Sequence, residues 1–180
     1  MNFNITDGCS GLKVIERKRN YDKRGCFEKL FCEDSFREFL DKDQIMQINY
    51  SHSKKKGTVR GMHFRKLHDE QKIVSCVRGS MMDVVVDLRR KSDSFLKVFY
   101  FNLSESNNKS LFIPKGFAHG WQALQNEVTV IYLHTKRYEP ENEIGFSAKD
   151  STLRIKWPQK ISLLSDNDLK LPELKEELFV

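Results

Sequence analysis

The sequence predicts an all-β protein built as a sandwich or a barrel. Short runs of β-branched and aromatic residues recur along the chain and are separated by turn residues. Helical signals are confined to two short segments, one near each end of the chain. With 180 residues, 39% of them hydrophobic and 13 of them Phe, the chain can bury a sizeable core without a disulfide or metal. We therefore expect one domain that spans residues 1–180.

Seven runs predict strands, and each has the length and composition of a short strand bounded by turn residues. In chain order they are Thr58–Phe64, Ile73–Val77, Met81–Leu88, Phe95–Leu103, Leu111–Ile113, Trp121–Leu124 and Val128–His134. Ser35–Leu40 predicts a short amphipathic helix. Leu171–Phe179, with a proline near its start followed by glutamates, predicts a short peripheral helix near the C-terminus.

The charge balance suggests an anionic partner but identifies none. The chain has 31 Lys and Arg against 25 Asp and Glu, so 31 − 25 gives +6. The basic run Lys54–Lys56 precedes a glycine and reads as a solvated hairpin. Basic residues that are helix-borne or interleaved with aromatics are absent, so no nucleic-acid partner is expected.

The compartment is expected to be the cytoplasm, with no membrane partner. No apolar stretch approaches the ~20 residues of a membrane span. The N-terminal residues carry no basic-then-apolar export pattern. The four cysteines form no CxxC pair, which excludes a zinc ribbon, and they are expected to stay reduced.

Two of the five histidines stand in suggestive contexts. His63 follows Gly57 after five residues, and His119 ends the pattern P-x-G-x-x-H that begins at Pro114. On a regular strand Arg60 and His63 would point to opposite faces. A bulge at Gly61 would instead bring them together.

These two patterns resemble the paired motifs of the cupin superfamily, which are small jelly-roll barrels. Metal-binding cupins place a second histidine two residues after the first, where this chain has Arg65. A catalytic first-row metal site needs about three protein ligands, and His63 with His119 falls short. We therefore expect a cupin-like jelly roll with no metal and no other cofactor.

Without a metal, a histidine is a natural general base, and a carboxylate on its other nitrogen fixes its tautomer. A tyrosine could supply the matching acid. Tyr132 shares a strand face with Val128 and Val130, which we expect to point inward. From the strand alone, packing and acid catalysis both remain open for Tyr132.

A longer series of segments resembles the dTDP-4-dehydrorhamnose 3,5-epimerase family and covers roughly 150 residues. The most specific are RGMH at 60–63 and IPKGFAHG at 113–120. The others are DKRG at 22–25, QINYS at 47–51, QKIV at 71–74, RG at 78–79, DVVVDLR at 83–89, Tyr132 and YEPENE at 138–143.

The resemblance implies epimerisation of a nucleotide-linked 4-keto-6-deoxy sugar for surface-polysaccharide biosynthesis, with no cofactor. It makes His63 the base, Tyr132 the acid and Asp168 the carboxylate that pairs with the histidine. Lys72, or alternatively Arg60, would stabilise the enolate oxygen. The implied substrate contacts are Arg24, Lys29, Gln47, Asn49, Arg60, Lys72, His119, Tyr138 and Glu143.

Three positions depart from the family pattern and leave the substrate open. Lys29 stands where members often carry an acidic residue, Arg65 where a glutamine is common, and Asn167 where a lysine contacts substrate. The nucleotide could be dTDP, GDP, UDP or CDP, the sugar a hexose or a heptose, and the inverted centre C3 alone or both C3 and C5. A 3,4-ketoisomerase and a non-catalytic sugar-binding jelly roll are the alternatives. The resemblance also implies a homodimer in which Arg24 reaches the neighbour's site.

Overall fold

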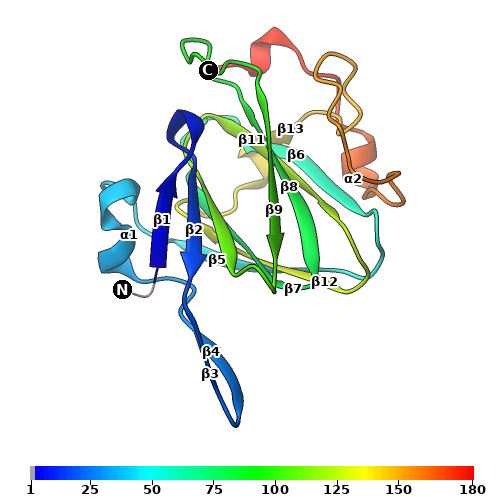
Figure 1. Ribbon diagram of the computed structural model, residues 1–180. Coiled ribbons are helices and arrows are strands. Elements are labelled where there is room, and N and C mark those ends of the chain that lie inside the picture. Colours follow the sequence, from blue (N-terminus) through cyan, green and yellow to red (C-terminus); the bar gives the residue numbers. More distant parts are fainter. Residues whose placement is uncertain (1–2) are drawn as a thin grey trace.

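The computed structural model describes residues 3–180 and has two antiparallel sheets that face each other (Figure 1). The larger sheet has the order β1-β2-β10-β7-β12-β5. Its strands are Phe3–Asp7, Lys13–Arg17, Lys109–Ile113, Lys72–Arg78, Val128–His134 and Gln47–Ser53. The smaller sheet has the order β13-β6-β11-β8-β9. Its strands are Glu143–Gly145, Val59–Arg65, Phe117–Ala123, Ser80–Asp87 and Val98–Ser104.

The prediction of an all-β jelly roll is confirmed, because the strands from β5 to β13, except the neighbours β8 and β9, alternate between the two sheets and enclose a shared core. Val74, Val85, Leu111, Trp121 and Val130 meet in this core, and each is at most 1% exposed. Apolar side chains from both sheets thus pack beneath the polar pocket described below.

All seven predicted strands are present, with shifted ends. The run Phe95–Leu103 starts late, because β9 begins only at Val98. Leu96 has a positive φ of 60°, which no strand residue adopts. The strand predicted at Trp121–Leu124 begins earlier, at Phe117, so the histidine of the P-x-G-x-x-H pattern lies on β11.

Two helices flank the barrel. α1 (Glu33–Leu40) confirms the predicted helix at 35–40 and buries Phe36 and Leu40 against the larger sheet. α2 (Asp166–Leu169) is a single turn near the C-terminus. No helix within residues 3–180 has both the length and the apolar character needed to cross a membrane.

The helix predicted at Leu171–Phe179 is wrong, since only a 3-10 turn forms there, at Glu176–Leu178. Apart from the two bonds of this turn, backbone groups of the segment bond to other parts of the chain. Pro172 O accepts from Ser147 N, and Leu174 N donates to Asp150 Oδ2. The apolar side chains at 174, 178 and 179 pack on the smaller sheet, and this tertiary packing overrides the local helix preference.

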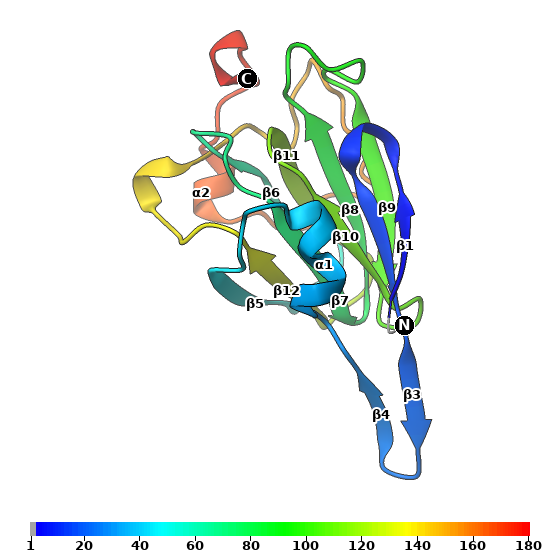
Figure 2. The ribbon, with the colours of Figure 1, turned by 90° about the vertical axis from the view of Figure 1, so that its left-hand side faces the viewer.

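A two-stranded hairpin, β3 (Arg19–Asp22) and β4 (Gly25–Glu28), projects away from the barrel (Figures 1 and 2). Two large apolar side chains on it, Tyr21 and Phe27, are 73% and 72% exposed. Both side chains of this hairpin are therefore open to solvent in the single chain.

Candidate active site

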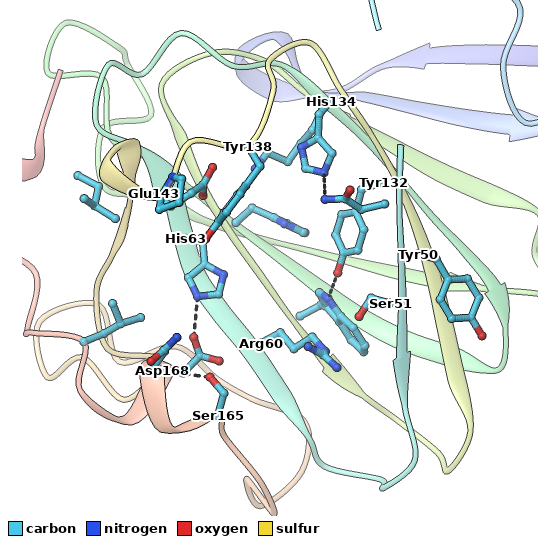
Figure 3. A pocket seen from close by; sticks show the side chains of 18 of the residues that line it. Tyr50, Ser51, Arg60, His63, Tyr132, His134, Tyr138, Glu143, Ser165 and Asp168 are labelled. Carbon is cyan, nitrogen blue, oxygen red and sulfur yellow. Dashed lines mark hydrogen bonds and ion pairs between the residues drawn. The ribbon is translucent and has the colours of Figure 1, made fainter. Parts of the chain in front are cut away.

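A pocket of about 770 Å³ opens between the two sheets (Figure 3). That volume suits a ligand of the size of a nucleotide sugar. Strands of both sheets, the 138–144 segment and α2 contribute to its wall. Nine of the twelve residues predicted for the site line it, namely Asn49, Arg60, His63, Lys72, His119, Tyr132, Tyr138, Glu143 and Asp168.

A β-bulge in β6 explains why Arg60 and His63 share the pocket. Opposite them on β11, His119 pairs with His63 and Trp121 pairs with Arg60. Two residues of β6 therefore lie opposite the single Gly120, and the extra residue resets the alternation of side chains. The bulge that we considered at Gly61 is thus present.

Glycines at 61 and 120 are required at this bulge. Gly61 has φ 112°, and a Cβ there would lie 2.7 Å from the Gly120 Cα. A Cβ on Gly120 would lie 2.9 Å from the Arg60 carbonyl oxygen. The RGMH and AHG runs therefore encode the close approach that turns both Arg60 and His63 into the pocket.

His63 forms a pair with Asp168, as the resemblance implied. His63 Nε2 lies 2.6 Å from Asp168 Oδ1, and the carboxylate is buried while the ring is half exposed. Ser165 at the N-cap of α2 fixes Asp168 by accepting its backbone N–H at 3.0 Å. Nδ1 of the neutral ring is then an acceptor on the pocket side, toward Tyr132 and Arg60 (Figure 3).

Asp168 is held ionised. Burial opposes its charge, but the hydrogen bond from His63 and the charge of that ring outweigh burial and lower the pKa of Asp168 below its usual value. An ionised partner fixes the tautomer of His63 and stabilises the imidazolium that forms when the ring accepts a proton. The pair is therefore suited to general-base chemistry.

Tyr132 faces the pocket from the other sheet. Val128 and Val130 on its face are buried, as predicted. Trp121 Nε1, which can only donate, donates to the Tyr132 hydroxyl, and Ser51 lies beside it (Figure 3). Burial raises the pKa of Tyr132, so the phenol stays protonated at neutral pH. Since its oxygen accepts from Trp121, its own proton remains available to a ligand.

Two further carboxylates support the pocket and were missed by the sequence analysis. Fully buried Asp83 accepts from His119 at 3.0 Å between Oδ2 and Nε2. Glu70 contacts Lys72 and His134 from behind the wall. Asp83 begins the DVVVDLR segment, which gives it no role, and Glu70 stands in no motif. Only the strand pairing of β8 with β11 and of β7 with β12 brings them to their partners.

Arg24, Lys29 and Gln47 do not line the pocket of their own chain. Gln47 lies one step away and donates through Nε2 to Asn49 Oδ1 at 2.9 Å. Arg24 lies at the tip of the projecting hairpin, 90% exposed, with its guanidinium on Asp22. Lys29 directly follows β4 at the base of that hairpin.

The position that would hold a second metal-binding histidine carries a buried cation. Arg65 donates to Asp69 Oδ1 at 2.9 Å and to Glu139 Oε2 at 2.8 Å. A guanidinium there repels a metal ion and supplies no ligand. Residues 3–180 contain no cluster of three or more His, Cys, Asp or Glu side chains that could hold one.

Comparison with known proteins agrees with this geometry. The family model for dTDP-4-dehydrorhamnose 3,5-epimerase matches residues 7–176. The dTDP-4-dehydrorhamnose 3,5-epimerase of Methanothermobacter thermautotrophicus is 35% identical over 96% of this chain and 94% of its own. That of Escherichia coli is 37% identical over 91% and 89%.

Solved structures extend the likeness to the fold. The dTDP-6-deoxy-D-glucose-3,5-epimerase of Legionella pneumophila, in complex with dTDP-4-keto-L-rhamnose, superposes with a TM-score of 0.90. It is 34% identical and covers 98% of this chain and 97% of its own. A 3'-monoepimerase of Streptomyces bikiniensis in complex with dTDP-quinovose gives 0.83, at 31% identity over 91% and 83%. The chain belongs to the dTDP-4-dehydrorhamnose 3,5-epimerase family, and it is an isomerase that epimerises nucleotide-linked 4-keto-6-deoxy sugars.

Proposed function

We propose that His63 and Tyr132 carry out this epimerisation on a dTDP-linked 4-keto-6-deoxy sugar, without a cofactor. One observation carries the proposal. A histidine–carboxylate pair centred on β6 and a half-buried, protonated tyrosine on β12 face one pocket from opposite sheets. A base and an acid on opposite walls address opposite faces of a sugar ring, as inversion of a carbon centre requires.

The chemistry starts at a carbon next to the C4 ketone. His63 Nδ1 removes the proton from C3 or C5, and the electron pair of the broken C–H bond moves into the ketone to form an enolate. Lys72 and Arg60 line the pocket and can stabilise that oxygen. Tyr132 then delivers its proton to the same carbon from the opposite face, and the ketone re-forms. Solvent returns a proton to Tyr132 and takes one from His63.

The nucleotide part of the substrate fits the rim of the pocket. Tyr138 exposes 61% of its surface there and offers a flat aromatic face to a nucleobase. The Legionella pneumophila relative is in complex with a dTDP-linked 4-keto sugar, which favours dTDP among the candidate nucleotides. GDP, UDP and CDP are the comparison substrates of the test below.

The decisive measurement is product NMR in D2O with 4-keto-6-deoxy sugars on each of the four nucleotides. The expected result is deuterium incorporation with inversion at C3 and C5, or at C3 alone, fastest with dTDP. Incorporation at C3 alone identifies a monoepimerase. Absence of exchange with every substrate would contradict the proposal. A product whose ketone has moved to C3 would replace it with the ketoisomerase alternative.

We also propose a homodimer in which the β3–β4 hairpin completes the partner's pocket. The arm projects from its own barrel (Figure 2). It exposes Tyr21 and Phe27 and carries Arg24 at its tip, and Arg24 does not line the pocket of its own chain. A guanidinium suits a diphosphate because it can bind two phosphate oxygens at once. The partner's hairpin would add a guanidinium for the diphosphate to the cations Arg60 and Lys72 of the pocket.

Complementation between two variants tests this arrangement. Arg24→Ala is expected to raise KM about tenfold or more, and His63→Asn to be inactive. If Arg24 serves the partner's pocket, mixed dimers contain one intact site, and about a quarter of all sites recover after subunit exchange. Lys54→Ala, a cation lost from the solvated run, is the control and should leave KM unchanged. A monomeric mass, or a mixture with no recovered activity, would contradict the proposal.

We further propose that residues 1–180 form a single domain and that the protein works in the cytoplasm. Both sheets share one core, which supports the first point. Cys9, Cys26, Cys32 and Cys76 are all free thiols, and a reducing compartment keeps them so.

A further inference from the structure

The ammonium of Lys72 is tied to a buried carboxylate that no step of the mechanism uses. Lys72 Nζ lies 2.9 Å from Glu70 Oε2, and His134 Nδ1 lies 2.9 Å from Glu70 Oε1. The Glu70 side chain is only 7% exposed and does not line the pocket, whereas Lys72 and His134 do. Glu70 therefore lies behind two wall residues and binds one with each oxygen.

The charge of Lys72 and the hydrogen bonds that Glu70 accepts keep the Glu70 carboxylate ionised. Burial opposes ionisation, but the charge of Lys72 and the hydrogen bonds from His134 and Lys72 lower the pKa of Glu70 to about 2. An ionised carboxylate only accepts, so His134 Nδ1 must carry a hydrogen. Glu143, on the pocket side of Lys72, has a raised pKa because burial outweighs the charge of Lys72. Of the two carboxylates near Lys72, only Glu70 is a fixed counter-ion.

A chain of hydrogen bonds continues from His134 to the rim. Tyr138 N–H donates to Gln47 Oε1 at 2.8 Å, and Gln47 Nε2 donates to Asn49 Oδ1 at 2.9 Å. Asn49 Nδ2 lies 3.4 Å from His134 Nε2, which accepts when the ring is neutral (Figure 3). Every donor in the series has an acceptor, from the backbone N–H at the rim to the carboxylate of Glu70. The donor-to-acceptor direction of these bonds is fixed at the two ends, because the backbone N–H of Tyr138 can only donate and the carboxylate of Glu70 can only accept.

We propose that Glu70 and His134 are positioning residues that aim the ammonium of Lys72 at the substrate's C4 oxygen. The proposal rests on the proposed function, because it assigns Lys72 to the enolate oxygen. A lysine has a long flexible stem, and a carboxylate held on its far side by a second hydrogen bond limits where the ammonium can point. Hydrogen bonds through Asn49 and Gln47 connect His134, and with it the Glu70 carboxylate, to the backbone of Tyr138 at the rim.

A purely structural role is the competing explanation, and the two differ in how substitutions combine. A buried ion pair is weak evidence for stability. If Glu70 acts through Lys72, its loss should matter only while Lys72 is present. If Glu70 only supports the fold, its loss should cost the same in either background.

The experiment is a double-mutant cycle of Glu70→Gln and Lys72→Met, with deuterium exchange into the dTDP-linked 4-keto-6-deoxy sugar as the readout. Glu70→Gln is expected to lower kcat about 10- to 100-fold, the scale of a misplaced catalytic group, with KM changed less than about threefold. In the Lys72→Met background, the same substitution should cost less than about twofold. Glu127→Gln is the matched control, because Glu127 also contacts a histidine, His52 at 3.1 Å, outside the pocket. It should leave kcat unchanged.

Additive losses, or a kcat of Glu70→Gln within twofold of the unsubstituted protein, would overturn the proposal. If Glu70→Gln does not fold, His134→Phe takes its place in the cycle, since it keeps an aromatic ring to stack on Tyr132, at 5.8 Å in the unsubstituted protein, and removes the bonds to Glu70 and Asn49. It should lower kcat about three- to tenfold, and again only with Lys72 present. Lack of exchange by the unsubstituted protein would contradict the proposed function instead, so the two failures are distinguishable.

Discussion

Replacing His63 by Asn is expected to abolish deuterium exchange at both C3 and C5, with kcat at least about 10³-fold lower. One residue should control both centres, because His63 is the base of the histidine–carboxylate pair that faces the pocket. An asparagine can hydrogen-bond to Asp168 but cannot accept a proton at neutral pH. Exchange at each carbon is followed by NMR in D2O, and substrate binding is measured separately by calorimetry.

The control for this prediction is His68→Asn, a histidine outside the pocket with a positive φ of 50° that asparagine tolerates. Its exchange rate should match that of the unsubstituted protein. Exchange at C5 that survives in His63→Asn would mean that a second base serves that carbon, and would contradict the assignment.

The lowered pKa of Asp168 predicts in which direction stability and exchange change with pH. Its pKa in the folded state lies below the ordinary value of about 4, so its contribution to stability is complete above that value. The contribution is lost only as the pH falls through the lowered pKa. Loss of exchange through protonation of Asp168 is therefore not expected above about pH 4. In Asp168→Asn the amide cannot stabilise the imidazolium, and kcat should fall at every pH.

Much of the fold was predictable because the central strands are apolar. β7, β8 and β12 are rich in buried β-branched residues, and each was located to within a residue or two. β1 and β5 were missed because they lie at the edges of the larger sheet and are mostly exposed. An edge strand carries little hydrophobic alternation, so its pattern resembles a loop.

The site residues also fall into two groups: those that a local motif marks and those that only the fold brings to the pocket. His63 and His119 stand in local motifs because glycines at 61 and 120 constrain the backbone around them. Asp168 carries no motif, and it reaches His63 across 105 residues only because α2 packs on β6. Glu70 and Asp83 are buried partners of pocket residues, and a buried polar residue is visible only once strand pairing is known.

Replacing Tyr132 by Phe is expected to leave deprotonation of the sugar largely intact and to impair protonation from the opposite face. His63 remains, so deprotonation continues, and solvent exchange of the proton on His63 returns deuterium to the face it left. Exchange should fall less than about tenfold, while formation of at least one inverted centre should fall about 100-fold. The ratio of exchange to inversion, read from one NMR time course, is the measurement.

That ratio is informative because the lost hydroxyl also has a structural partner. Trp121 Nε1 donates to it, and leaving that buried N–H without an acceptor costs about 1–3 kcal/mol of stability. Tyr100→Phe is the matched control, since Tyr100 Oη accepts from Lys156 N at 2.9 Å outside the pocket. A loss of stability alone lowers exchange and inversion in equal proportion, whereas loss of the acid lowers inversion selectively. Equal losses in Tyr132→Phe would contradict the assignment of Tyr132 as the acid, and the inverted centre that fails first would identify the carbon that Tyr132 protonates.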